Sequence, residues 1–163
     1  MHARSITPSS NKIISNLQGS VESLFKEIQI LQSSATDIHD ADSLGAVEIA
    51  LHKRATKLAD IISAIKIQEA LNNNKLNEAE KDLLKSHPGK MKNMGRRTVT
   101  IRMLGGTLVT IEVTYYHQKS DTKSRSGKGF YPKLLLLGIH EKCTPALSSR
   151  VSLFATAACS FEI

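Results

Sequence analysis

A stretch near the middle of the chain, GRRTVTIRMLGGTLVTIEVTYYHQK, alternates apolar and polar residues on both sides of a Gly-Gly pair. Such alternation predicts two β-strands, and the glycines between them predict a hairpin. A two-residue turn at the Gly-Gly pair would place Ile101 opposite Thr110. A three-residue loop that begins at Leu104 places Ile101 opposite Val109 instead. We expect the longer loop, because it sets apolar against apolar and puts Gly106 where such loops need a left-handed residue.

The two expected strands each have an apolar face and a polar face, since successive side chains of a strand point to opposite sides. The apolar face holds Val99, Ile101, Met103, Val109, Ile111 and Val113. The polar face holds Thr98, Thr100, Arg102, Thr110, Glu112 and Thr114. We expect the apolar face to pack on helices and the polar face to be free to meet a partner.

Two long helices are expected before the hairpin. Apolar residues three and four apart form a narrow seam between residues 14 and 31, which predicts a helix over residues 8–32. A second apolar stripe runs between residues 44 and 65 and predicts a helix over residues 44–71. We expect these two helices to form an antiparallel pair in which each buries the apolar stripe of the other.

Shorter elements are expected on either side of the hairpin. A third helix is predicted over residues 77–86, where Asn77 and Glu80 have the spacing of a capping box. After the hairpin, the apolar residues 134–139 predict a buried strand or a short helix, and residues 147–160 predict a helix rich in alanine.

Together these patterns predict an α+β fold with antiparallel N-terminal helices, a basic antiparallel β-hairpin and a C-terminal helix. We expect a helical region over residues 1–86, the hairpin and a basic loop over residues 87–133, and an apolar segment with its helix over residues 134–163. The last helix has no glycine stop and no polar tail, so we expect the natural protein to continue beyond it.

The net charge of +7 is concentrated in one segment of the chain. Residues 1–86 hold ten Lys and Arg against eleven Asp and Glu, whereas residues 87–133 hold ten against two, a balance of +8. A concentrated basic patch favours a polyanion partner, most often nucleic acid. The predicted DNA-binding residues are the basic side chains of this segment and the tyrosines that end the hairpin: Lys90, Lys92, Arg96, Arg97, Arg102, Lys119, Lys123, Arg125, Lys128, Lys133, Tyr115 and Tyr116.

The basic residues of the second expected helix differ from those of the hairpin. Lys53, Arg54 and Lys57 lie on a helix whose acidic residues balance their charge. We therefore expect these three side chains to contribute little to the binding of nucleic acid.

Two other functions fit the same sequence. The seam of the first helix would serve a helical interaction protein that forms a homodimer, with the basic loop as a solvated surface. A small RNA-binding protein is the other alternative, because four aromatic residues that can stack on bases flank the loop: Tyr115, Tyr116, Phe130 and Tyr131.

No motif in the chain predicts a catalytic residue, a metal ligand or a cofactor. The six histidines lack a tight ligand spacing, and the two cysteines lie 16 positions apart, outside any CxxC pair. No apolar window approaches the length of a membrane span, and the N-terminal residues lack the apolar segment of a signal peptide. We expect a cytoplasmic protein without a membrane partner.

The hairpin, the run GKGFYPKLLLLGIHEKCTPALSSRVSLFA and the helical GAVEIALHKRATKLADII together resemble the N-terminal region of bacterial insertion-sequence transposases of the DDE, ribonuclease-H-like class. The resemblance covers about residues 44–163. Its best parts are the paired tyrosines that end the hairpin and the GxxP…LGI…TP run that follows. In that family this region precedes the catalytic domain and helps to grip transposon ends, so the resemblance implies a DNA partner.

The resemblance also implies what this chain lacks. The two metal ions of phosphoryl transfer, expected as Mg²⁺, would be held by an acidic triad beyond Ile163, so we expect this chain to be non-catalytic. Many relatives carry paired cysteines around the hairpin that suggest a zinc ribbon. Here the stretches KSHPGKMKNMG and YYHQKSDTKS contain no cysteine, so the resemblance supplies no zinc ligands.

Overall fold

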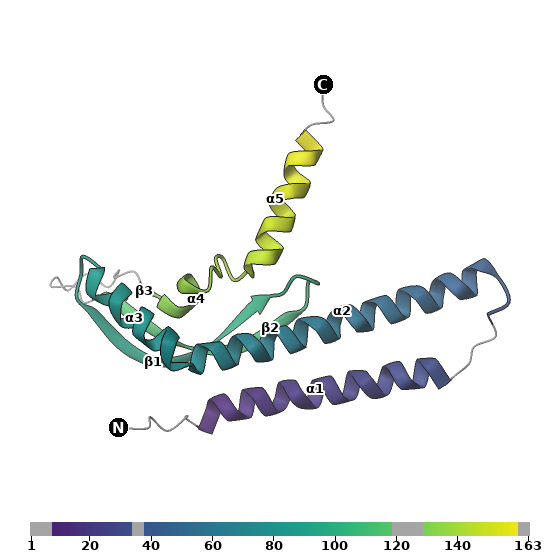
Figure 1. Cartoon of the computed structure of the whole chain (residues 1–163), viewed down its shortest axis with the longest axis horizontal. Helices are drawn as coiled ribbons and strands as arrows, with labels where there is room; N and C mark the ends of the chain where they lie inside the picture. Colours follow the sequence, from purple (N-terminus) through teal and green to yellow (C-terminus); the bar gives the residue numbers. More distant parts are fainter. Residues whose placement is uncertain (1–7, 34–37, 119–128, 160–163) are drawn as a thin grey trace.

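Helices come first along the chain and a small antiparallel sheet follows them, which confirms the predicted α+β fold (Figure 1). The computed structural model describes residues 8–33, 38–118 and 129–159. Its elements are α1 (Pro8–Ser33), α2 (Ala41–Asn72), α3 (Asn74–Ser86), β1 (Met91–Arg102), β2 (Leu108–Gln118), β3 (Gly129–Phe130), α4 (Pro132–Leu136) and α5 (Pro145–Cys159). The predicted positions of the long helices and of the hairpin are confirmed, and α2 and α3 begin three residues earlier than expected.

The starts of α2 and α3 are fixed by side-chain caps. Asp40 accepts a hydrogen bond from the Ser43 N–H at 2.7 Å, and the Ser43 hydroxyl accepts one from the Asp40 N–H at 3.1 Å. The cap of α3 is Asn73, whose side chain accepts from the Lys75 N–H at 3.0 Å. The prediction that Asn77 caps this helix was therefore wrong, because Asn73 offers an oxygen one turn earlier.

The hairpin between β1 and β2 has the register that its apolar pattern favoured. Ile101 lies opposite Val109. The Met103 N–H donates to the Thr107 carbonyl at 2.9 Å, which closes a three-residue loop. Gly106, at the end of this loop, has a φ of 88°. The longer loop and its left-handed glycine are both confirmed.

The sheet has the order β1-β2-β3, so β1 is an outer strand. Its regular pairing with β2 is interrupted between Asn93 and Arg96 by a bulge at Gly95, which has a φ of 84°. At the other end of β1, the outer edge meets the chain that follows α4. There the Arg102 N–H donates to the Lys142 carbonyl at 2.7 Å.

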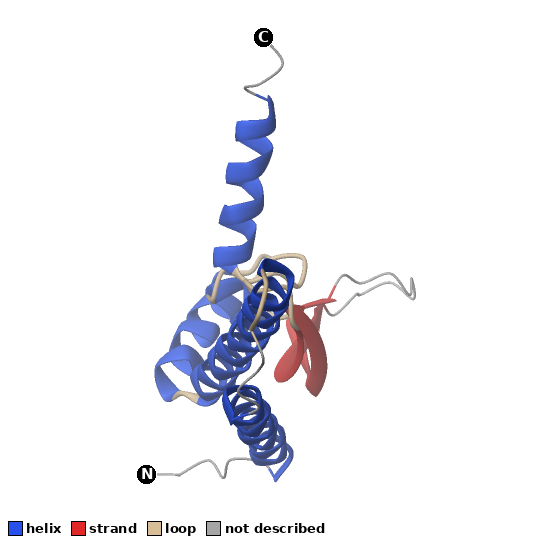
Figure 2. Ribbon diagram, turned by 90° about the vertical axis from the view of Figure 1, so that its right-hand side faces the viewer, coloured by secondary structure: helices blue, strands red, loops and turns tan. Residues whose placement is uncertain are grey.

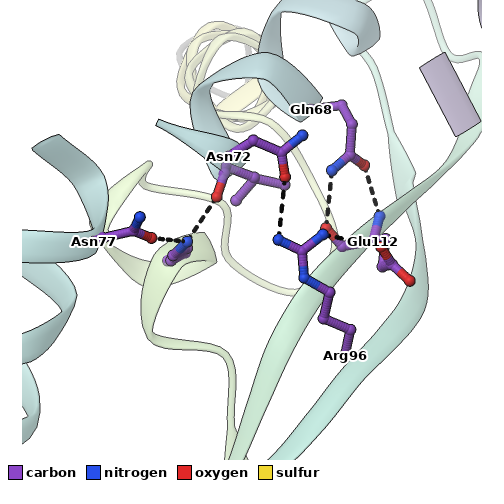
Figure 3. Close-up of polar contacts among 7 residues, drawn as sticks. Gln68, Asn72, Asn77, Arg96 and Glu112 are labelled. Atoms are coloured by element: carbon purple, nitrogen blue, oxygen red, sulfur yellow. Dashed lines mark hydrogen bonds and ion pairs between the residues drawn. The ribbon is translucent and has the colours of Figure 1, made fainter. Parts of the chain in front are cut away.

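Side chains of α2 meet the hairpin along the edge of β2 and at the loop. The Gln68 amide donates to the Glu112 carbonyl at 3.0 Å and accepts from the Glu112 N–H at 2.7 Å (Figure 3). The Asp60 carboxylate accepts from the Gly105 N–H at 2.9 Å and from the Thr107 N–H at 3.1 Å. These four hydrogen bonds satisfy backbone groups that the short strand β3 does not reach.

The apolar face of the hairpin is the centre of the core, as expected. The sheet lies along one side of α2, with α3 on the other side (Figure 2). The buried residues that pack together come from the hairpin, α2 and the region of α4: Ala64, Leu71, Val99, Ile101, Met103, Val109, Ile111, Val113, Leu134 and Ile139. Residues 134–139 thus contain a short helix, one of the two predicted alternatives, and contribute to the core.

The antiparallel pairing of α1 and α2 is present, but the stripe of α2 is not buried as predicted (Figure 1). Leu44, Leu51 and Ile62 are 45%, 37% and 43% exposed. The buried residues of α2 are Asp60, Ile61, Ala64, Gln68 and Leu71, which lie toward its C-terminal end. The prediction failed because α2 packs on both α1 and the sheet. The helix face that packs on the sheet includes the polar residues Asp60 and Gln68.

The helix α5 leads away from the rest of the molecule (Figures 1 and 2). Its residues Val151, Leu153 and Phe154 are exposed. No helix in the described ranges is both long enough and apolar enough to cross a membrane.

Candidate nucleic-acid interface

The basic residues of the hairpin belong to one strand. β1 contains Lys92, Arg96, Arg97 and Arg102 and no acidic residue. β2 contains no Lys or Arg, and its one acidic residue is Glu112. The positive charge of the hairpin therefore lies on an outer strand of the sheet.

Arg96 is held in place by contacts within the protein. Its guanidinium donates to Glu112 Oε2 at 3.1 Å and to Asn72 Oδ1 at 3.3 Å (Figure 3). Glu112 is buried because it pairs with Arg96 and because α2 covers its backbone. The expectation that Glu112 belongs to an open polar face is corrected, and Arg96 joins the sheet to the end of α2.

Lys133 does not belong to the surface, although it was predicted to bind DNA. It is 4% exposed, and its Nζ donates to the Leu71 carbonyl at 2.6 Å and to Asn77 Oδ1 at 2.5 Å. Glu80 Oε2 lies 4.0 Å from the same nitrogen. Lys133 closes the C-terminal end of α2 and connects α4 to α3, since a buried ammonium needs acceptors from the protein.

Glu80 is a buried partner of this lysine. Burial raises the pKa of the Glu80 carboxyl above its ordinary value, and the positive charges of Lys133 and Arg96 act in the opposite direction. Within the described part of the chain, Glu80 Oε1 has no hydrogen-bond partner. Asn77 and Glu80, which have the spacing of a capping box, thus serve Lys133 instead.

The aromatic residues at the end of the hairpin contact one another. The Arg97 guanidinium lies 4.1 Å from the centre of the Tyr115 ring, and the Tyr115 and Tyr131 rings are 5.0 Å apart. The Phe130 ring stacks on His87 at 5.4 Å. Tyr116 is half-buried and lies opposite Phe130 in the pairing of β2 with β3. These rings are packed within the fold, which makes them less suited to stacking on bases.

Five of the predicted DNA-binding residues are exposed on the described surface: Lys90, Lys92, Arg96, Arg97 and Arg102. Arg96 and Arg97 make the contacts with Glu112, Asn72 and Tyr115 given above. Lys90 and Lys92 lie at one end of β1, and Arg102 lies at the other. Arg102 lines a shallow hollow of about 370 Å³ together with Thr100, Leu108, Glu141, Lys142 and Cys143. Lys119, Lys123, Arg125 and Lys128 lie outside the described residues.

Between these two ends, the outward face of the hairpin is rich in threonine. Thr98, Thr100 and Thr110 are exposed, and the hydroxyl oxygens of Thr100 and Thr110 are 3.4 Å apart. Lys92 and Arg102 are ten residues apart on one strand, which corresponds to about 30 Å. This face thus has hydrogen-bonding groups at its middle and Arg102 at one end, whereas Lys92, which lies opposite His117 beyond the bulge, is on the other face of the sheet.

Two polar residues of α2 that position this face have no distinctive motif in the sequence. Gln68 and Asp60 resemble ordinary polar residues of a helix, yet both are buried against the hairpin. A signal was present for Gln68, because it lies between Ala64 and Leu71 on the helix face that turned out to be buried. A polar residue inside an apolar stripe often has a specific hydrogen-bond partner.

No group of three or more His, Cys, Asp or Glu that could hold a metal ion occurs in residues 8–33, 38–118 and 129–159. Comparison of the chain with models of protein families, with curated proteins and with solved structures finds no match in any of the three.

Proposed function

We propose that this chain binds double-stranded DNA through its β1–β2 hairpin, as the DNA-gripping part of a transposase. The observation that carries the DNA proposal is the outward face of the hairpin. Threonine hydroxyls occupy its middle and Arg102 is exposed at one of its ends, while Lys90 and Lys92 are exposed at the other end of β1. The acidic residue of the hairpin, Glu112, is already bound to Arg96 and does not oppose a polyanion.

The dimensions of the hairpin agree with this proposal. A two-stranded ribbon fits into the major groove of B-DNA, and threonine side chains can contact base edges there. The distance of about 30 Å between the cations at the ends of β1 is close to one helical turn of DNA. Lys90, Lys92 and Arg102 would then reach phosphates, while Thr98, Thr100 and Thr110 face the bases.

The transposase part of the proposal rests on the resemblance described above. In that family the two-metal chemistry belongs to a separate catalytic domain. We therefore assign no catalytic residue, metal or cofactor to residues 1–163. A bacterial DNA partner would place the protein in the cytoplasm.

A salt titration tests the DNA proposal. The variant K90Q/K92Q/R102Q removes three exposed cations, and K12Q/K26Q/K81Q removes three exposed lysines from α1 and α3 as a matched control. Binding to a fluorescent duplex of about two helical turns is followed by anisotropy at several salt concentrations. The slope of log K against log salt should flatten by about three units in the hairpin variant and little in the control.

Equal slopes for the two variants would show that only net charge matters and would refute binding through the hairpin. The same titration on single-stranded DNA and RNA addresses the RNA-binding alternative. Tighter binding to single strands than to duplex would favour that alternative over ours.

A second candidate function is that of a dimeric interaction protein, and the exposed stripe of α2 favours it. Leu44, Leu51 and Ile62 follow a spacing of seven and eleven residues and lie on one helix face. A two-fold antiparallel contact that sets Leu51 against Ile62 of a second copy also brings Glu48 beside Lys66, opposite in charge. Sedimentation equilibrium should then show a dimer that L51K/I62K dissociates, and a wild-type monomer would reject this function.

A further inference from the structure

A second hollow, larger than the one beside Arg102, lies between α2 and the loop of the hairpin. Its volume is about 490 Å³, and it is open on one side. We call it the tip hollow. Its lining residues come from α2 and from the hairpin loop: His52, Lys53, Thr56, Lys57, Gly105, Gly106 and Thr107.

The shape of the tip hollow depends on Asp60. This carboxylate is 4% exposed and accepts hydrogen bonds from the Gly105 and Thr107 N–H groups, so it ties the loop to α2. Gly105 lies so close to the helix that a Cβ there would overlap the Thr56 methyl group and come within 2.7 Å of Asp60 Oδ2. Both oxygens of the Asp60 carboxylate accept hydrogen bonds from the loop. None of the residues that line the tip hollow is acidic.

The α2 wall of the tip hollow is basic. Lys53 and Lys57 lie one turn apart on the same face of the helix, and both are exposed. Among the described residues, neither lysine has an ion-pair partner, whereas the neighbouring Arg54 pairs with Glu27 at 3.1 Å. His52 adds a ring nitrogen that can donate a hydrogen bond, and Thr56 and Thr107 add hydroxyl groups.

We propose that the tip hollow binds a phosphate group. Lysine ammonium groups are common phosphate ligands, and hydroxyls supply further donors to the phosphate oxygens. The volume is within the range of pockets that take small organic ligands, so a phosphate that carries a nucleoside also fits. The proposal gives Lys53 and Lys57 a direct role, in contrast to the expectation from the sequence that they contribute little to the binding of nucleic acid.

The position of the tip hollow connects it to the proposed function. It adjoins the loop that follows Arg102, at the same end of the hairpin as that exposed cation. The inference rests on the proposed function for the source of the phosphate, which is then the DNA backbone. A free nucleotide is the other source of the same chemistry.

The test uses the full chain and two probes, inorganic pyrophosphate and the DNA duplex. In ¹H–¹⁵N spectra, pyrophosphate should shift the amide signals of Gly105, Gly106 and Thr107. These shifts should be lost in K53Q/K57Q and kept in K12Q/K26Q, a control with the same change of charge on α1. Shifts that are equal in all three proteins, or absent from the wild type, would overturn the proposal.

The salt titration with the DNA duplex identifies the source of the phosphate. If DNA supplies it, K53Q/K57Q should flatten the salt slope by about two units relative to K12Q/K26Q. An unchanged slope together with the lost pyrophosphate shifts would support the site and assign it to a free nucleotide. The outcome is separate from that of K90Q/K92Q/R102Q, which tests the hairpin face alone.

Discussion

The two halves of α2 differ in what they bury. Residues 60–72 lie against the hairpin, and their buried positions include the polar Asp60 and Gln68. In residues 41–59 no residue is buried, and the apolar Ile49 is 71% exposed. The helix thus buries polar residues at one end and exposes large apolar ones at the other.

The difference has a physical cause in the neighbours of each half. The hairpin offers backbone N–H and C=O groups at the edge of β2 and in its loop, and a buried backbone group without a partner is costly. Asp60 and Gln68 supply the missing partners. The first half meets α1, and one neighbouring helix cannot cover all sides of another. Packing on this helix is therefore decided by backbone hydrogen bonding as much as by apolar area.

The largest expected effect is a difference in the free energy of unfolding between alanine variants of two isoleucines of α2. Ile61 is 4% exposed, and Ile61→Ala should lower the free energy of unfolding by about 3 kcal/mol because it leaves a cavity. The same change at Ile49 should have an effect of about 0.5 kcal/mol or less. Urea denaturation of both variants measures the difference. Similar losses would mean that both halves of α2 are buried in solution, for example by a second copy.

The next effect concerns the polar contact between α2 and β2. Gln68→Leu keeps the volume but leaves the N–H and C=O of Glu112 without partners, so we expect a loss of about 2–3 kcal/mol. Hydrogen exchange of the Glu112 amide should also become faster. Gln29→Leu, at an exposed position of α1, is the matched control. A neutral Gln68→Leu variant would show that apolar packing alone holds the hairpin on the helix.

A smaller effect is expected at the loop of the hairpin. Gly105→Ala places a methyl group against Thr56 and should cost about 1–2 kcal/mol through overpacking. Thr56→Ser removes the obstructing methyl group, so the double variant should recover part of this loss. Thermal unfolding of the two single variants and the double variant measures the coupling. Simple additivity of the two changes would contradict the close contact between the loop and α2.

The smallest effect involves Glu80 and Lys133, beside the end of α2. Burial raises the pKa of Glu80 above its ordinary value of 4.5, so protonation favours the folded state. The resulting contribution to stability is fully present below pH 4.5 and is lost as the pH rises through the raised pKa. Glu80→Gln should therefore stabilise the protein slightly at pH 7 and have no such effect at pH 4. A variant that is less stable at pH 7 would show that the charge of Glu80 supports Lys133.

Short-range rules explain why much of the fold follows from the sequence. The register of the hairpin was set by the period of its apolar residues and by a glycine that accepts a positive φ. The helices began near the residues where side-chain caps are available. These features depend on residues only a few positions apart, so the local sequence is enough to predict them.

The candidate site was only partly predictable. The sequence located the charge of the hairpin on residues that the fold leaves exposed, such as Lys90 and Arg102. The predicted DNA-binding residues also included Lys133, which the fold buries against Leu71 and Asn77. A count of charges gives no burial, because burial depends on contacts between residues far apart in the chain.

The sequence by itself determined the order of elements, the register of the hairpin and the segment that carries the charge. The tertiary structure decided which face of α2 is buried, because that choice depends on the backbone groups that the hairpin leaves unpaired. It also decided that Lys53 and Lys57 lie beside Gly105, at a distance of about fifty positions in the chain. Contacts of this kind have no local period, since they come from the closing of long loops around a common core.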